Sequence, residues 1–430
     1  MGYKLGLTRA SYIVSVSCFG SFAFAFDTGV ISMSSVATIK YLQHGQTVLF
    51  LIVGTILQVV NSHTLGTFYV GRVVAGVGIG AATVLIPMYS AEMAPKEIRG
   101  KLGACFQLFF ATGVMVAYWV TYAVSVDQPS VTKQWQIPLG LQLLPSSLLF
   151  IESPSNGVRG GDETEELQTE FDEILAGIEE EARIKENFTP RELLLPANRY
   201  RIFIAITIQL CAQLTGNTSL AYYAAQIFSA VGAGDSSMFV TGFFGVVKVV
   251  GVLIFQLFVL DRIGRRTPFM VGAAAMGSFM LIIACIVATH EPSATATQQG
   301  ATGAGIAAVI MIYAEAFSFN MSWGPLPWLY LGEIFSNRTR EIGIAIGAAS
   351  QWLFNFVMSQ MTPHAIANIG WRTFLIFAIF NYAIIVYSWM FLKETAGHSL
   401  EEMQAIFGGQ VSNHDNKDPD AARRQEVSTG

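Results

Sequence analysis

Long apolar segments recur along this 430-residue chain, and they constrain its fold more than any other feature. A helix needs about 20 apolar residues to cross a bilayer. Segments near that length lie at 11–36, 47–61, 65–91, 102–126, 135–151, 200–230, 236–260, 268–288, 302–332, 341–362 and 371–392. The pattern predicts an all-α polytopic membrane protein with 11 spans in a lipid bilayer.

Composition excludes the other broad classes of protein. Only 13% of the residues are charged, about half the usual share of a soluble globular protein. A soluble enzyme and a disordered chain are therefore ruled out, and the net charge of −5 suggests no nucleic-acid partner. Cys18, Cys105, Cys211 and Cys285 all lie inside apolar runs, without zinc or disulfide spacing. We expect no enzymatic activity, no cofactor and no metal.

Basic residues mark one side of the membrane. Lys and Arg are typical of cytoplasmic loops, and here they occupy alternate loops. They are Lys96, Arg99 and Lys101 in one loop, Arg262, Arg265 and Arg266 in another, and Arg338 and Arg340 in a third. The loops at 62–64, 231–235, 289–301 and 363–370 carry neither residue type. Both termini and the linker are therefore predicted to be cytoplasmic, and the plasma membrane is the expected location.

This alternation breaks near the start of the chain. Lys4 and Arg9 predict a first span that runs outward, and the span that starts at Thr47 must also run outward. Only residues 38–46 lie between them, and such a segment reaches about 30 Å when fully extended, barely the thickness of the hydrocarbon core. One span is therefore predicted to be absent between 38 and 47. The expected organisation is an N-terminal half at 1–151 with five spans, a linker with short helices at 152–199, a six-span half at 200–392 and a tail at 393–430.

A repeat relates the two halves. Glu92 and Arg99 follow one proline-marked helix, and Glu333 and Arg340 follow another, at the same spacing. The basic segment at 261–266 (DRIGRR) has no counterpart in the first half. The absent span and its following loop would be that counterpart.

Six motifs occur in a fixed order along the chain. They lie at 26–32 (FDTGVIS), 69–80 (YVGRVVAGVGIG), 92–100 (EMAPKEIRG), 261–266 (DRIGRR), 323–328 (WGPLPW) and 393–397 (KETAG), the last followed by 399–403 (SLEEM). Over about residues 20–405 the chain resembles the sugar-porter branch of the major facilitator superfamily. It is most similar to fungal members, with a quinate- or hexuronate-like subgroup as one candidate.

The resemblance implies a fold and a function. Members have 12 spans in two pseudo-symmetric halves, and they move a small polyhydroxylated solute, a neutral sugar or a hydroxy acid, by rocking the halves about a central site. It also implies salt bridges at the cytoplasmic mouth that lock the outward-facing state. The residues at these positions are Glu92, Arg99, Asp261, Arg262, Arg265, Arg266, Glu333 and Arg340. Charges that merely set membrane topology are the alternative.

Two charges lie within predicted spans of the first half. Asp27 lies about 24 Å from the cytoplasmic start of its span, and Arg72 about 10 Å from the outer end of its own. These depths agree within about one helical turn, so the two can pair and reduce the cost of burying charge. Protonation of Asp27 would release Arg72, which predicts proton symport. A structural ion pair in an uncoupled facilitator remains the alternative.

Polar side chains inside apolar helices are candidates for solute contact, since hydroxylated solutes need donors and acceptors on a pore wall. They are Gln107, Gln209, Gln213, Thr215, Asn217, Thr218, Asn320, Gln351 and Asn355. The resemblance assigns solute contact to Phe24, Gln107, Gln213, Tyr222, Trp328, Gln351, Trp352 and Asn355, and Thr218 replaces the usual asparagine. Ala212 and Val114 replace two further amides, which weakens a glucose assignment. Hydrogen bonds between helices are the alternative role.

Lys248 and Glu315 are also charges within predicted spans. Lys248 lies about 20 Å above the cytoplasmic end of its helix. It could pair with Glu315, or it could contact a carboxylate of the solute, and the latter hints at an acidic substrate. A structural pair or snorkelling is the alternative.

Three further expectations complete the analysis. The glycines at Gly71, Gly76, Gly78 and Gly80 suit close helix contact and not nucleotide binding. A solute sensor is a weak alternative, because sensors of this kind carry long signalling tails. A chain that transports nothing is a stronger alternative, because one span of the first half is absent.

Overall fold

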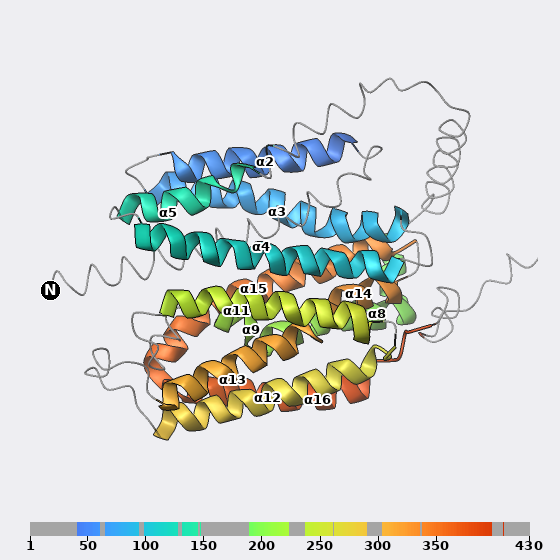
Figure 1. Ribbon diagram of the computed structural model, residues 1–430. Helices are drawn as coiled ribbons and strands as arrows, with labels where there is room; N and C mark the ends of the chain where they lie inside the picture. The colour runs from blue at the N-terminus through green and yellow to red at the C-terminus, as the bar shows by residue number, and fades with distance from the viewer. Residues whose placement is uncertain are drawn as a thin grey trace, which may run out of the picture.

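The computed structural model describes residues 41–60, 65–93, 99–127, 131–144, 147, 189–222, 237–260, 262–289, 303–335, 338–397 and 407. Within these ranges every regular element is a helix. Most of the helices run roughly parallel to one another, side by side (Figure 1). Phe24 and Asp27 lie outside the described residues, as do residues 38–40 of the segment in which one span is predicted to be absent.

The first half contributes four described helices. They are α2 (Tyr41–Val59), α3 (Leu65–Met93), α4 (Arg99–Asp127) and α5 (Val131–Gly140). α2 packs mainly against α3, and glycine brings their backbones together. A Cβ on Gly54 would lie 2.4 Å from the Ala75 nitrogen, and one on Gly71 would lie 2.8 Å from the Gly54 oxygen. Gly71 therefore makes the close helix contact that the sequence predicts.

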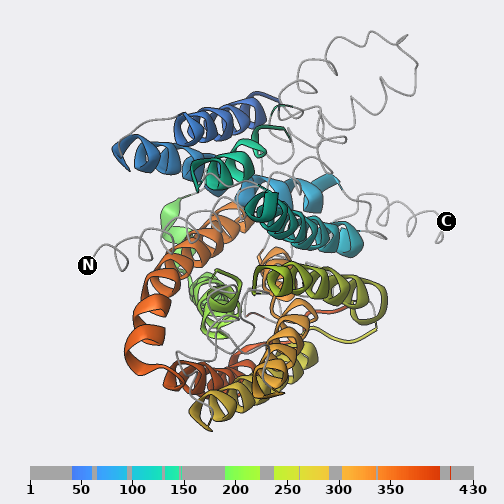
Figure 2. The same ribbon diagram turned by 60° about the vertical axis from the view of Figure 1, so that its left-hand side comes forward.

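The second half is more complete. Its helices are α8 (Pro196–Leu214), α9 (Asn217–Tyr222), α11 (Ser237–Ile254), a π-helical turn (Phe255–Val259), α12 (Arg266–Thr289), α13 (Gly303–Asn320), α14 (Leu326–Ile334), α15 (Arg340–Ile369) and α16 (Arg372–Phe391). A short 3-10 helix at Pro190–Leu194 precedes α8. Figure 2 shows α8 and α9 enclosed by a ring of α11, α13, α12, α16 and α15. Side chains of α8 accordingly reach the interior, where Ile204 and Ile208 are fully buried.

Two predicted continuous spans are broken helices. The span at 200–230 breaks where Gly216 takes a φ of +90°, a backbone conformation that favours glycine. The Asn381 side chain donates to the Thr215 carbonyl at 3.0 Å and so satisfies the helix end. The span at 302–332 breaks at residues 321–325, because Pro325 and Pro327 cannot donate backbone hydrogen bonds.

The fifth predicted span is also different. α5 ends at Gly140, well before the expected end at 151. Pro138 lies inside this helix and removes one donor. The helix ends in a tighter turn, in which the Gln142 N–H donates to the carbonyl of Leu139, three residues back, at 3.2 Å.

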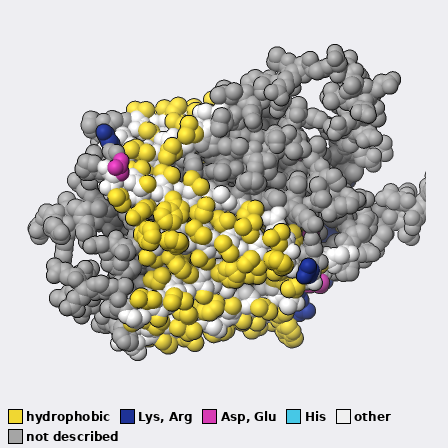
Figure 3. Space-filling view, in the orientation of Figure 1, with side chains coloured by type: hydrophobic (Ala, Val, Ile, Leu, Met, Phe, Trp, Pro, Cys, Tyr) yellow, Lys and Arg dark blue, Asp and Glu magenta, His cyan; other side chains and the backbone are white. Residues whose placement is uncertain are grey.

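An apolar surface covers the middle of the bundle. Figure 3 shows hydrophobic side chains across this face and coloured charges only toward its two ends. Among the described residues, five helices are long and apolar enough to cross a membrane: Phe239–Val259, Arg266–Thr289, Gly303–Asn320, Arg340–Ile369 and Arg372–Phe391. The exposed apolar surface is what a bilayer would cover. The all-α membrane prediction is confirmed.

α4 joins the two halves. It packs along α11 (Figure 1), and the Tyr118 hydroxyl donates to the Ala221 carbonyl at 2.7 Å. The Trp119 ring lies edge-on to Phe239 and Phe243, with centroids 5.8 and 5.4 Å away. This contact places the polar side chains of α4 opposite those of α8, α9 and α15.

Candidate solute site and its gate

A cavity lies between α4 and the second half. Its walls carry polar and aromatic side chains together. The lining residues are Gln107, Phe110, Ala111, Val114, Gln209, Ala212, Asn217, Thr218, Ala221, Lys248, Phe319, Asn320, Trp323, Gly324, Pro327, Trp328, Gln351, Trp352 and Asn355. A pocket with aromatic walls and a few convergent polar groups is typical of a small-molecule site.

The cavity brings together most of the predicted solute contacts. Seven of the ten line it: Gln107, Thr218, Lys248, Trp328, Gln351, Trp352 and Asn355. Gln213 is buried on α8 but does not line the cavity. The side chains of Phe24 and Tyr222 lie outside the described residues. Val114 and Ala212, which replace amides expected from the resemblance, also form part of the wall.

Several polar atoms in the wall have unused hydrogen-bonding capacity. Gln209 Nε2 and Gln351 Oε1 are buried and have no partner among the described residues. Buried polar groups are normally hydrogen-bonded, and an unpaired one costs about 1–3 kcal/mol. One of these atoms is a donor and the other an acceptor, so both can bind a hydroxyl group. Gln209 belonged to the set of polar residues in apolar helices but not to the set that the resemblance assigned.

Two buried charges lie near this cavity, one in its wall and one behind it. Lys248 lines it, and its Nζ lies 5.2 Å from the Phe244 ring centroid. Glu315 is fully buried on α13 and does not line the cavity. Asn217, which does line it, donates to Glu315 Oε2 at 3.0 Å.

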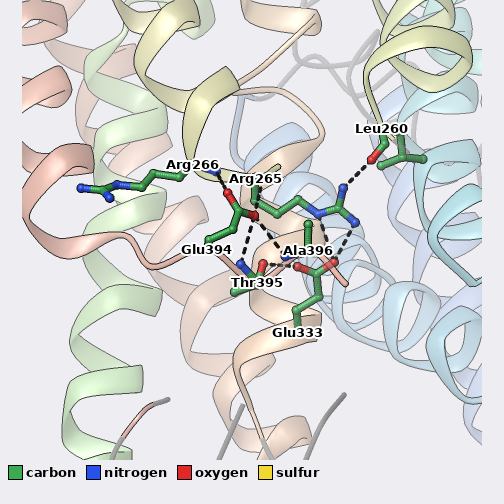
Figure 4. Close-up of polar contacts among 7 residues, drawn as sticks. All are labelled: Leu260, Arg265, Arg266, Glu333, Glu394, Thr395 and Ala396. Carbon is green, nitrogen blue, oxygen red and sulfur yellow. Dashed lines mark hydrogen bonds and ion pairs between the residues drawn. The ribbon is translucent and has the colours of Figure 1, made fainter. Parts of the chain in front are cut away.

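A polar network closes one end of the second half (Figure 4). Arg265 Nη2 and Nε contact Glu333 Oε1 at 3.0 and 3.2 Å, and Arg265 Nη1 donates to the Leu260 carbonyl at 2.6 Å. The Thr395 hydroxyl donates to Glu333 Oε2 at 2.5 Å. The network thus joins the α11–α12 loop, the end of α14 and the segment that follows α16. We call this end of the bundle the Arg265 end.

Glu394 is the second acceptor in this network, and the sequence analysis gave it no role. Its carboxylate accepts from the backbone N–H groups of Arg265 at 2.6 Å and Arg266 at 3.1 Å. It also accepts from those of Thr395 and Ala396. Burial raises the pKa of Glu394, but these backbone donors outweigh it and hold that pKa below its usual value. The motif at 393–397 (KETAG) was the sequence signal for this role of Glu394, because it combines one carboxylate with a turn.

A further ion pair ties the linker to this end. Arg338 Nε and Nη2 each donate to a Glu192 oxygen at 2.8 Å. The hydrogen bond from Arg338 lowers the pKa of Glu192, and the same contact raises the pKa of Arg338. Because the pair is largely exposed, its energetic contribution is small. It still fixes where the end of the linker meets the loop before α15.

The other predicted gate residues are placed as follows. Arg262 is exposed, Arg340 is buried at the start of α15, and Arg266 donates to the Trp389 carbonyl. Asp261 and the side chains of Glu92 and Arg99 lie outside the described residues. Arg72 lies on α3 with its guanidinium carbon 5.3 Å from the Phe68 ring centroid.

These features define a class of protein: a polytopic helical transporter of the major facilitator type. Solved structures of that type match it. A proton:xylose symporter, XylE, bound to 6-bromo-6-deoxy-D-glucose aligns with a TM-score of 0.70 at 21% identity, covering 93% of this chain and 99% of that one. An inward-open structure of the xylose transporter from E. coli aligns with a TM-score of 0.68 over 92% and 89%. At this identity the likeness establishes the fold.

Sequence comparison identifies the family. The model of the "Sugar (and other) transporter" family matches residues 40–407. A "Probable quinate permease" of Neosartorya fischeri is 34% identical over 383 residues, 82% of this chain and 70% of that protein. A "Quinate permease" of Emericella nidulans is 30% identical over 393 residues, 84% of this chain and 73% of that one. The chain belongs to this sugar-transporter family, whose members here are permeases and not enzymes.

Proposed function

We propose that this protein moves a small polyhydroxylated solute across the membrane by alternating access, together with a proton. The solute is a neutral sugar or a hydroxy acid. Among the two, the hydroxy acid is favoured by the cationic Lys248 in the cavity wall and by the quinate permeases among its relatives.

The cavity between α4 and the second half carries this proposal. Gln107 comes from the first half, and Gln351 and Asn355 come from α15 of the second half. A solute that touches both halves binds differently when they rock, and such differential binding is what a carrier needs. The Trp328 and Trp352 rings supply the apolar face that ring carbons require.

Proton coupling is assigned to Asp27 and Arg72. Arg72 lies on α3, within the span predicted at 65–91. A charge there is costly without a partner, and protonation of Asp27 would change the balance between the two carrier states. The Arg265 end is taken as the cytoplasmic mouth, where the Arg265–Glu333 pair closes the gate.

Uptake into proteoliposomes of the full chain tests this function. Labelled quinate, xylose and glucose are offered with and without an inward proton gradient. We expect accumulation of at least one solute, collapse of that accumulation by a proton ionophore, and its loss in Asp27→Asn with solute exchange retained. Uptake that is unchanged without the proton gradient, and unchanged in Asp27→Asn, would instead identify a facilitator.

A further inference from the structure

A buried charged group of the second half lies beside the cavity. It consists of Lys248 on α11, Glu315 on α13 and Asn217 on α9. All three are buried, with exposed fractions of 7%, 0% and 2%. A buried ion pair is expensive to maintain, and hydrophobic residues of similar volume are often at least as stable. The group therefore calls for a function beyond stability.

The geometry of the three residues is asymmetric. Lys248 and Asn217 line the cavity, but Glu315 lies behind them. Asn217 donates to one Glu315 oxygen at 3.0 Å, and the other oxygen, Oε1, has no hydrogen-bond partner among the described residues. No ion pair among the described residues joins Lys248 directly to Glu315, although the two charges interact electrostatically. A solute in the cavity can thus reach Lys248 without reaching Glu315.

Other charges do not face this carboxyl group. Lys248 is the only charged residue of α11, and Glu315 is the only one of α13. On α12 the only charge is Arg266, at its first residue, and α9 has none. The Tyr313 hydroxyl, on the same helix as Glu315, donates to the Val240 carbonyl at 2.6 Å. Among the described residues, Lys248 is therefore the group that balances the negative charge of Glu315.

We infer that Glu315 is a second proton-binding site, which takes up a proton when the carboxylate of a hydroxy acid binds Lys248. This inference rests on the proposed function and names its substrate class. In the empty site the positive Lys248 balances the negative Glu315. A bound carboxylate takes over Lys248 as its counter-ion, and Glu315 is left as an uncompensated buried anion, which is strongly unfavourable.

The charge balance closes with one proton. The solute brings one negative charge, and a proton from the same side binds Glu315 at its unpaired Oε1, so the occupied site is again neutral. On the other side of the membrane the solute leaves, Glu315 releases its proton, and Lys248 balances Glu315 once more. Both the loaded and the empty site are neutral, so neither carries net charge through the membrane.

Binding of quinate to the purified full chain in nanodiscs tests this inference. The probes are quinate and its neutral methyl ester, between pH 5.5 and 8.5, above the range in which quinate itself titrates. We expect the Kd for quinate to rise toward tenfold per pH unit at the alkaline end, because one proton binds with each quinate. A pH indicator in weak buffer should record uptake of about one proton more per quinate bound than per ester bound. Any proton that Asp27 takes up is common to both solutes, so the ester is the control for it.

Two substitutions assign the effect to this group. Glu315→Gln keeps the acceptor for Asn217, and in this variant quinate and the ester should show the same pH dependence of Kd and the same proton uptake. Lys248→Met should weaken quinate binding at least tenfold and leave ester binding within about twofold, since a charge-assisted contact is lost. Asp127→Asn and Lys133→Met, two exposed charges outside the cavity, are the matched controls and should behave as the wild type.

The outcomes separate this inference from the proposed function. A pH-independent Kd without proton uptake in the wild type overturns it, and this measurement needs no variant to fold. A difference in proton uptake between quinate and the ester that persists in Glu315→Gln also overturns it and places the proton elsewhere. Binding of xylose or glucose but not quinate overturns it while transport of a neutral sugar stands. Failure to bind or move any of these solutes would overturn the proposed function as well.

Discussion

Arg265 links separate segments of the chain at its end of the bundle. It donates to Glu333 and to the Leu260 carbonyl, and its backbone N–H donates to Glu394. Through its side chain and its backbone, this one residue therefore ties the α11–α12 loop to the end of α14 and to the segment after α16, which must separate if this end opens. A planar group with several donors suits that role better than a lysine would.

The Arg265–Glu333 contact gives a prediction at the residue scale. Glu333→Gln removes the charge from a partly buried pair and should cost about 1 kcal/mol, which is roughly a fivefold rise in local opening. Hydrogen–deuterium exchange of the amides of Arg265, Arg266, Thr395 and Ala396 measures it, since all four donate to neighbouring Glu394. Asp127→Asn, which removes a charge at the opposite end of α4, should leave these rates unchanged. Unchanged rates in Glu333→Gln would show that the pair does not hold this end closed.

Single residues also show how far the sequence could define the site. Gln107, Gln351 and Asn355 were identified because a polar side chain in an apolar helix needs a partner. The same criterion marked Gln213, which does not line the cavity. Gln209, which does line the cavity, and Gln213 both lie on α8, and hydropathy alone does not determine which side of that helix faces the cavity. Glu394 went unassigned because its partners are backbone groups that only the folded chain brings near.

At the scale of elements, the break between α8 and α9 is the least predictable feature. Composition marks 200–230 as one apolar segment, but it carries no information about backbone dihedral angles. The φ of +90° at Gly216 and the Asn381 contact that caps the helix end depend on tertiary packing. The break between α13 and α14 had a signal in Pro325 and Pro327, yet the sequence analysis treated 302–332 as one span.

Gly216→Ala tests whether that break is required. A Cβ there would lie 2.8 Å from Phe377 Cγ, and alanine disfavours the positive φ. We expect a loss of about 1–3 kcal/mol in stability, measured as a lower unfolding temperature in detergent. Gly303→Ala is the control, because a Cβ at Gly303 meets nothing within 4 Å and its φ is not positive. If the two variants unfold at the same temperature, the helix break at Gly216 is not required for stability.

The start of α2 sharpens the case for an absent span. α2 begins at Tyr41, so residues 41–46 are helical and not an extended connector. A helical residue advances only about 1.5 Å, and a return across about 30 Å of hydrocarbon is then out of reach. We therefore expect the native transcript to carry extra codons between those for Thr38 and Thr47, enough for one span and a basic loop. A transcript that matches this chain would contradict that expectation.

At the scale of the whole molecule, the two halves serve different purposes. The second half carries most of the cavity wall and the complete Arg265 network, and the first half supplies α4 as the opposing wall. The fold class and family were predictable from apolar segments and ordered motifs, because both are properties of sequence. Which polar side chains converge could be predicted only in part, because it depends on helix rotation.

The central claim is that this cavity carries a solute from one side of the membrane to the other. Counterflow in proteoliposomes tests it most directly, since exchange needs neither a gradient nor a particular coupling ion. Vesicles loaded with unlabelled quinate, xylose or glucose are diluted into a trace of the same labelled solute. We predict transient labelled uptake above that of protein-free vesicles for at least one solute, reduced about tenfold in Asn355→Leu by loss of a buried polar contact. No counterflow for any of the three by folded wild-type protein would contradict the account.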